Sequence, residues 1–127
     1  MGKGFKHKVL TLEDIKNVKY TKYESVEKLK KNYGLGDDIE ISIDTGWVSS
    51  EFNLGDEKIF VYRFKLKNRE CGFVLISENG NVLALVDIYE PHSCYINTEK
   101  NLFLCYGHEQ IILLWLDEGK FEEIYTR

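Results

Sequence analysis

The sequence has few of the residues that mark secreted or membrane-spanning proteins. It contains one proline, one methionine and three cysteines among 127 residues. Because an odd number of cysteines cannot form a complete set of disulfides, Cys71, Cys94 and Cys105 are expected to be buried free thiols in a reducing compartment. The longest apolar run, Ile111–Leu116, has six residues, whereas a membrane-spanning helix needs roughly 20.

Sequence motifs for cofactor binding and targeting are also absent. No apolar run of signal-peptide length follows the basic N-terminal residues, so we expect a cytoplasmic protein without membrane association. Gly34-Leu35-Gly36 begins like a dinucleotide-binding loop, but Ile39 stands where the third glycine belongs, and the loop precedes a strand. No P-loop pattern occurs. We therefore expect no cofactor, no catalytic residue and no enzymatic activity.

Charge is distributed unevenly along the chain. Residues 1–36 carry nine lysines and four acidic residues, residues 37–127 carry eight basic and 17 acidic residues, and the net charge is −4. Because nucleic-acid binding depends on neutralising phosphates with basic side chains, we do not expect direct binding of nucleic acid. The asymmetry predicts two faces of different electrostatic character.

The first part of the chain has helical features. Thr11 and Asp14 have the spacing of a helix capping box. A second, lysine-rich stretch with apolar residues at helical spacing begins at Ser25 and ends at Gly34. The pattern therefore predicts that residues 1–36 form helices.

From residue 37 onward the apolar residues recur with a period of two. Ile39–Ile43 alternates between isoleucine and polar residues, which predicts a half-buried strand. The clearest hairpin joins Cys71–Ser77 to Val82–Tyr89 through Glu78-Asn79-Gly80, because Asn-Gly supplies the positive φ angles of a tight turn. Ile111–Leu116 is apolar at every position, which predicts a central strand covered on both faces.

These elements predict an α+β fold in a single domain, residues 1–127. The N-terminal helices are followed by a bent, mostly antiparallel β-sheet or small barrel of about eight strands. Residues 1–36 form the helical, basic part and residues 37–127 the β-rich, acidic part.

A second pattern contains potential metal ligands. His92, Cys94, Cys105 and His108 form H-x-C followed by C-x-x-H. If Glu99-Lys100 is a turn, Cys94 lies opposite Cys105, and four nitrogen and sulfur ligands suit tetrahedral zinc. A shift of one residue would move Cys105 to the other face of the hairpin. A small enzyme or a zinc- or ligand-binding barrel is therefore the alternative, whereas we expect buried thiols, loop histidines and no metal.

Acidic residues beyond residue 36 are interspersed with aromatic residues, which suggests a surface that binds a basic protein. Aromatic side chains supply contact area, and carboxylates steer a positively charged partner. The aromatic candidates are Trp47, Tyr89, Tyr95, Tyr106, Trp115 and Tyr125. The predicted partner-binding residues are Asp37, Asp38, Asp44, Trp47, Glu51, Asp56 and Glu57. The second choice is the group Asp117, Glu118, Glu122 and Glu123.

In size, acidity and lack of a catalytic motif, the chain resembles the immunity proteins with which bacteria neutralise toxins. The resemblance is one of overall type and transfers no site residue. It implies a cytoplasmic, non-enzymatic protein that covers a toxin domain, and the acidic surface favours a basic, nuclease-like toxin. A third possibility is a domain of a larger assembly, in which the basic stretch 25–33 docks on an acidic partner.

Overall fold

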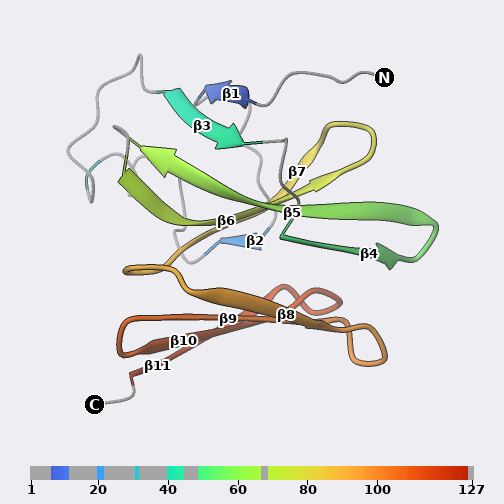
Figure 1. Cartoon of the computed structure of the whole chain (residues 1–127). Coiled ribbons are helices and arrows are strands. Elements are labelled where there is room, and N and C mark those ends of the chain that lie inside the picture. Colours follow the sequence, from blue (N-terminus) through green and yellow to red (C-terminus); the bar gives the residue numbers. More distant parts are fainter. Residues whose placement is uncertain are drawn as a thin grey trace.

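The computed structural model describes residues 7–11, 20–21, 31, 40–44, 49–66 and 69–125. Eleven strands occur in this part of the chain, and none of its elements is a helix. The strands form two sheets that lie one above the other (Figure 1).

The larger sheet has seven strands in the order β1-β3-β5-β6-β7-β2, and β4 also pairs with β5. All of these pairs are antiparallel except β2, which runs parallel to β7. The strands are β1 (His7–Thr11), β2 (Tyr20–Thr21), β3 (Glu40–Asp44), β4 (Ser50–Leu54), β5 (Glu57–Leu66), β6 (Arg69–Ser77) and β7 (Val82–Asp87).

The smaller sheet has four strands in the order β11-β10-β9-β8, and each strand pairs antiparallel with the next one along the chain. Its strands are β8 (Ser93–Asn97), β9 (Leu102–Gly107), β10 (Gln110–Trp115) and β11 (Lys120–Tyr125). The turns that join β8 to β9 and β10 to β11 point to the same end of the molecule as the β4–β5 and β6–β7 turns (Figure 1).

The predicted α+β class is wrong, because the described part of residues 1–36 contains strands. β1 pairs with β3 along its whole length, and β2 pairs with β7. Thr11, which the sequence suggested as a helix cap, lies in a β-ladder because pairing with a distant strand overrides weak local propensity. The expected helix at 25–33 lies outside the described residues except for Lys31. The single bent sheet is also wrong, since the strands form two sheets.

The main core lies between the two sheets. Phe73 of β6 and Phe103 of β9 are fully buried, and their rings meet edge to face with centroids 6.1 Å apart. Apolar residues from both sheets surround this pair: Phe52, Ile59, Val61, Leu75, Ala84, Val86, Ile88, Cys105, Ile112, Leu114 and Leu116. Removing this apolar surface from water is the main force that holds the sheets together.

A second core lies on the opposite face of the larger sheet. It contains Ile41, Ile43, Phe64, Leu66, Cys71, Val74, Ile76 and Leu85. β6 is therefore buried on both faces, from Cys71 to Ser77. The sequence predicted this property for Ile111–Leu116 instead. β10 is indeed central in its sheet, but its alternate side chains, beginning with Ile111, are only half-buried.

The predicted hairpin of Cys71–Ser77 with Val82–Tyr89 is confirmed as β6 and β7. Gly80 in its turn has a φ of 91°, whereas Asn79 is not among the residues with positive φ, so the positive φ expected of Asn-Gly is found only at the glycine. Within the described residues, we find no helix with the length and apolar character needed to cross a membrane.

Candidate functional site

The four-stranded sheet points one set of side chains to the core and the other set away from the larger sheet. The register aligns Tyr95, Leu104 and Leu113 in one cross-strand row that ends at Glu122. The two flanking rows are Ser93, Tyr106, Ile111, Ile124 and Asn97, Leu102, Trp115, Lys120. The apolar members of these rows form what we name the outer face: Tyr95, Leu102, Leu104, Tyr106, Ile111, Leu113, Trp115 and Ile124.

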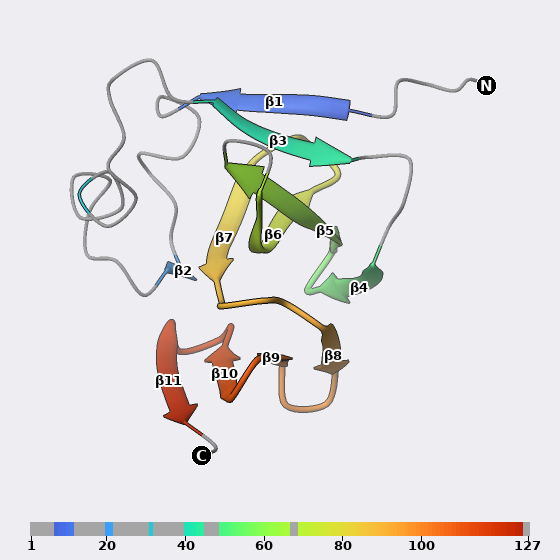
Figure 2. The same cartoon turned by 60° about the vertical axis from the view of Figure 1, so that its left-hand side comes forward.

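The outer face is accessible to solvent. Tyr95 is 60% exposed and Ile124 is 39% exposed, and the remaining members are half-buried. Strands β8–β11 form a layer at one side of the molecule, and no described strand lies beyond it (Figures 1 and 2). The outer face is therefore a continuous apolar surface without a cover among the described residues.

Three rings stack at one end of the outer face. The ring of Tyr106 lies between His92, with centroids 5.9 Å apart, and Tyr95, with centroids 6.3 Å apart, and both pairs are nearly parallel. A hydrogen bond with Tyr106 raises the pKa of the Tyr95 phenol above its usual value. Tyr95 therefore stays a neutral, amphipathic ring at physiological pH and offers both contact area and a polar tip.

Acidic residues surround this layer. Residues 88–125 contain seven carboxylates and two lysines. One of the lysines, Lys120, lies over the ring of Trp115 at 5.3 Å from the centroid, and Glu122 closes the middle row of the outer face. The remaining acidic residues occupy the connections and the inner side of β11, so the layer as a whole is negatively charged.

The chain passes from β7 to β8 through Tyr89-Glu90-Pro91, which we name the crossover. The main chain of the crossover is fixed by backbone hydrogen bonds from His108 N to Tyr89 O, 2.9 Å, and from His92 N to Tyr106 O, 2.9 Å. Gly107 lies directly beneath it. A Cβ at Gly107 would overlap the Tyr89 carbonyl and lie 2.7 Å from that of Glu90, so only glycine allows this approach.

Arg63 of β5 ties the crossover to the larger sheet. Its guanidinium donates to the carbonyls of Pro91, at 3.0 Å, and His92, and it forms an ion pair with Glu70 at 3.2 Å. It also lies 5.2 Å from the centroid of the Phe73 ring. Arg63 therefore links the larger sheet to the segment that leads into the smaller sheet.

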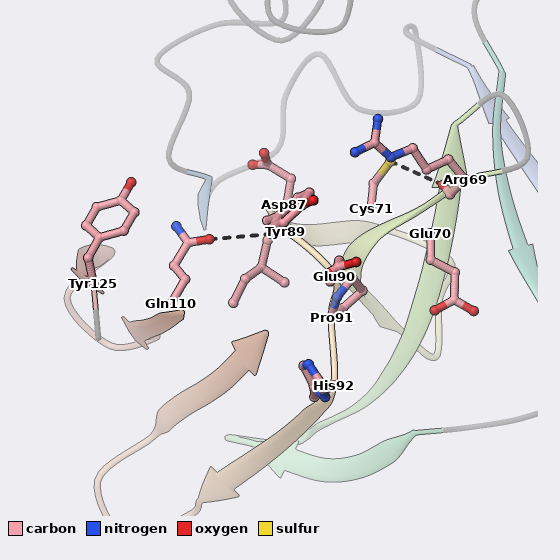
Figure 3. A pocket seen from close by; sticks show the side chains of 11 residues that line it. Arg69, Glu70, Cys71, Asp87, Tyr89, Glu90, Pro91, His92, Gln110 and Tyr125 are labelled. Atoms are coloured by element: carbon pink, nitrogen blue, oxygen red, sulfur yellow. Dashed lines mark hydrogen bonds between the residues drawn. The ribbon is translucent and has the colours of Figure 1, made fainter. Parts of the chain in front are cut away.

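A cleft of about 870 Å³ opens beside the crossover. We name it the crossover cleft. Gln110 and Tyr125 of the smaller sheet lie on one side, Arg69, Glu70 and Cys71 of the larger sheet lie on the other, and crossover residues lie between them (Figure 3). Gln110 is buried, accepts from Tyr89 N at 3.4 Å and donates to Glu123 at 2.7 Å, so it joins the crossover to β11.

The first group of predicted partner-binding residues is only partly described. Glu51, Asp56 and Glu57 share the β4–β5 hairpin of the larger sheet, where Glu51 pairs with Lys58 at 3.4 Å. Glu57 accepts from Asn79 at 3.2 Å. Asp44 is the last residue of β3. The other predicted members, Asp37, Asp38 and Trp47, lie outside the described residues.

The second predicted group belongs to the smaller sheet. Asp117 and Glu118 lie in the β10–β11 turn, and Glu122 and Glu123 lie on β11. Asp117 accepts two hydrogen bonds from the Asn101 side chain, at 2.9 and 2.8 Å. Of this group, Glu122 belongs to the rows of the outer face, whereas Glu123 points to the inner side with Gln110 and Tyr125.

The potential zinc ligands do not converge. Cys94 lies opposite Cys105, as predicted, but both face the core, and Cys105 is fully buried. His92 stacks on Tyr106, and His108 lies 3.7 Å from Glu90 and 3.8 Å from Glu109. In the part of the chain that the structure describes, no three His, Cys, Asp or Glu side chains are placed to share a metal ion.

No disulfide joins the three cysteines, as the sequence predicted. Cys71 and Cys105 are buried, and Cys94 is half-buried. Burial raises the pKa of the Cys94 thiol, and the positive charge of Arg63 opposes this shift only in part. A thiol with a raised pKa is a weak nucleophile at neutral pH.

The outer face and the crossover cleft are the two features that sequence reasoning missed. An apolar side chain such as Leu104 or Leu113 does not show whether another layer of the protein covers its side of the sheet, so the sequence could not tell these residues from core residues. The signal that could have found the outer face is the absence of polar residues at alternate positions of β9 and β10, since a half-exposed sheet normally alternates.

No protein-family model, no curated protein and no solved structure matches the chain.

Proposed function

We propose that this protein is a non-enzymatic protein-binding module whose outer face receives a basic partner protein. The observation that supports the proposal most strongly is that apolar and aromatic side chains of β8–β11 lie in adjacent cross-strand rows on one face of the sheet. Large apolar patches rimmed by polar residues mark interaction sites. Tyr and Trp are enriched among the residues that contribute most to binding energy, and the outer face contains Tyr95, Tyr106 and Trp115.

The sign of the partner's charge follows from the charge of the layer. Seven carboxylates against two lysines in residues 88–125 create a negative potential that attracts a basic surface and accelerates its association. A negatively charged partner would meet repulsion at the rim of the outer face.

A second copy of this chain fits less well than a basic partner. β11 is the edge of its sheet, and edge strands are prone to pair with other chains. Antiparallel pairing of β11 with itself around its centre would place Glu122 opposite Glu123 twice. Like charges directly opposite each other destabilise a strand pair, so these two glutamates oppose self-association at this edge.

Neutralisation of a toxin is the specific form of this function that we favour. A nuclease-like toxin must carry a basic surface to hold the phosphate backbone, and an acidic protein can cover such a surface quickly and tightly. A bacterial, cytoplasmic origin belongs to the same proposal. Asp44, Glu51, Asp56 and Glu57 belong to the larger sheet, so in this proposal they are at most a second region of contact.

Affinity capture with matched variants tests the proposal. Wild-type protein and Tyr95→Asp are immobilised in parallel and exposed to extract from the parent cells. We expect a basic protein that the wild type retains and Tyr95→Asp loses. Its measured affinity should fall by at least about tenfold in the variant, and also when salt rises, because surface charges are screened.

The control exchanges charge on the other sheet. Asp56→Lys combined with Glu57→Lys reverses two carboxylates of the first predicted group without touching the outer face. We expect a smaller loss of affinity than for Tyr95→Asp. Equal retention of the partner by the wild type and Tyr95→Asp would refute binding through the outer face, and a larger effect of the hairpin variant would place the site on β4–β5 instead.

A further inference from the structure

The crossover cleft is the second place where the structure offers a binding site. Gln110 and Tyr125 line it from the inner side of the smaller sheet, and His92, another lining residue, stacks on Tyr106 of the outer face. We propose that it receives a guanidinium group, the side chain of an arginine that the partner protein presents. This inference rests on the proposed function for the identity of the partner. The chemistry of the cleft can nevertheless be tested without the partner.

The size and position of the cleft suit an inserted side chain. Its volume of about 870 Å³ lies within the range of roughly 300–1,000 Å³ that small-molecule sites show. Tyr125, the last residue of β11, lines it on the side of the smaller sheet (Figure 3). Because β11 also contributes Ile124 to the outer face, a partner bound there can reach around the edge of the sheet into the cleft.

Two tyrosine rings make the cleft suitable for a flat cation. Tyr89 is 53% exposed and Tyr125 is 70% exposed, and both line the opening. The face of an aromatic ring attracts cations, and arginine is the residue most often found there. A guanidinium can stack on a ring and still donate hydrogen bonds in its own plane, which an ammonium group cannot do in the same way.

The charges that line the cleft favour a cation over an anion. Glu70, Asp87 and Glu90 contribute three carboxylates, against one positive side chain, Arg69. Glu70 is paired with the guanidinium of Arg63, whereas Glu90, on the exposed crossover, lies 3.7 Å from the imidazole of His108. An entering cation would compete with an arginine at Glu70 but with a histidine at Glu90, so Glu90 is the carboxylate placed to meet it. Glu123 adds negative charge behind Gln110, to which it is hydrogen-bonded at 2.7 Å.

The position of Glu90 is fixed by the backbone. Its φ is 46°, in the left-handed region that residues other than glycine seldom adopt. The crossover hydrogen bonds and the close approach over Gly107 hold this conformation. Such conformations persist where the surrounding structure determines them and concentrate at ligand sites. Glu90 therefore has a fixed main chain at the cleft, and its carboxylate lies 3.7 Å from the imidazole of His108.

Titration with blocked amino acids tests this inference on the full chain. N-acetyl-L-arginine amide is added to labelled protein, and amide chemical shifts are followed by NMR. We expect saturable shifts at Tyr89, Glu90, Gln110 and Tyr125, with a dissociation constant on the order of 1 mM, as suits a ligand of this size. N-acetyl-L-citrulline amide has nearly the same shape without the charge and should bind at least tenfold more weakly.

Matched variants assign the interaction to the cleft. Glu90→Gln keeps the shape of the side chain and should weaken the arginine probe about three- to tenfold, whereas Tyr125→Ala removes one ring from an exposed position and should weaken it similarly. Tyr95→Asp, on the outer face, should leave the probe affinity unchanged. Circular dichroism and thermal unfolding confirm that each variant is folded.

The outcomes separate this inference from the proposed function. Equal binding of the arginine and citrulline probes, shifts outside the cleft, or no saturable shift would overturn the guanidinium site while leaving partner binding through the outer face intact. Conversely, selective binding of the arginine probe together with no effect of Tyr95→Asp on partner capture would keep the cleft site and reject the outer face.

Discussion

The two sheets of this protein differ in how their faces are used. The seven-stranded sheet packs apolar side chains on both faces, and β6 is buried from Cys71 to Ser77. Among the described residues, the four-stranded sheet packs only its inner face, although its outer face is almost as apolar. Antiparallel sheets with one solvated face commonly show polar residues on that face, so the apolar character of the outer face is the observation that supports the proposed binding role.

The crossover joins the two sheets, and it too has one side that packs against the protein and one side that is exposed. Arg63 contacts the larger sheet through Phe73 and Glu70 and the crossover through two carbonyls. On the other side, Tyr89 and Glu90 remain open to solvent. One side of the crossover therefore contacts the rest of the fold, and the other side is exposed.

The largest effect is expected from a cavity between the sheets. Phe73→Ala removes a fully buried ring that contacts Phe103, and such substitutions cost about 3–5 kcal/mol of unfolding free energy. Leu113→Ala, on the half-buried outer face, should cost about 1 kcal/mol, because it leaves no enclosed cavity. Urea unfolding measures both. Similar losses would contradict the difference between the core that lies between the sheets and the outer face.

An intermediate effect is expected at the crossover. Arg63→Met removes the ion pair with Glu70 and both hydrogen bonds to the crossover carbonyls, and charged hydrogen bonds contribute about 1.5–3 kcal/mol each when their partners stay buried. Because this site is partly exposed, we expect a loss of about 2 kcal/mol. Lys65→Met, at an exposed position of the same strand, is the control and should change stability by less than about 0.5 kcal/mol. A reversed order would argue against the role of Arg63.

A small effect on stability is expected on the outer face itself. Tyr95→Ser removes a ring that is 60% exposed, and surface substitutions usually change stability by less than about 0.5 kcal/mol. Thermal unfolding should therefore barely distinguish the variant from the wild type, while partner affinity falls. A large loss of stability would mean that the stacked rings hold the fold, and the capture experiment would then need another variant.

The smallest effect concerns the thiol of Cys94 and how it depends on pH. Because burial raises its pKa above the usual 9.0, alkylation by iodoacetamide should be slow at neutral pH and should have a midpoint above pH 9. The same shift links stability to pH. The folded state holds the proton more tightly, so this contribution is fully present below the unfolded pKa and is lost as pH rises through the folded pKa. A midpoint below 9 would contradict this account.

Local patterns predicted the second half of the fold better than the first. The β6–β7 hairpin and the pairing of Cys94 with Cys105 depend on short turns. The residues of such turns, for example Asn79-Gly80, are adjacent in sequence and can be recognised from it. β1 was misread because its partner, β3, is distant in sequence and Thr11 has a local alternative as a helix cap. The local propensity of a few residues is weaker than the pairing with a distant strand, and this pairing exists only in the folded chain.

The sequence analysis named three aromatic residues of the outer face, but it did not predict that they share one side of one sheet. Tyr95, Tyr106 and Trp115 were among the predicted aromatic residues, and the outer face brings them onto one side of one sheet. The sequence analysis preferred the first acidic group as partner-binding residues. Of this group, Glu51, Asp56 and Glu57 lie on the β4–β5 hairpin of the larger sheet. Sequence neighbours share charge, but a surface is assembled across strands, and only the register shows that Glu122 lies in line with Leu113 and Tyr95.

The parallel pairing of β2 with β7 has a consequence for how the molecule folds. Tyr20 and Thr21 meet Ala84 and Leu85, so this short ladder closes a very long loop, while the hairpins from β4 onward close short ones. Long loops cost more chain entropy to close and slow the search for contacts. The N-terminal strands should therefore join last, onto a framework of hairpins that has already formed, and exchange of amide hydrogens should be fastest in β2.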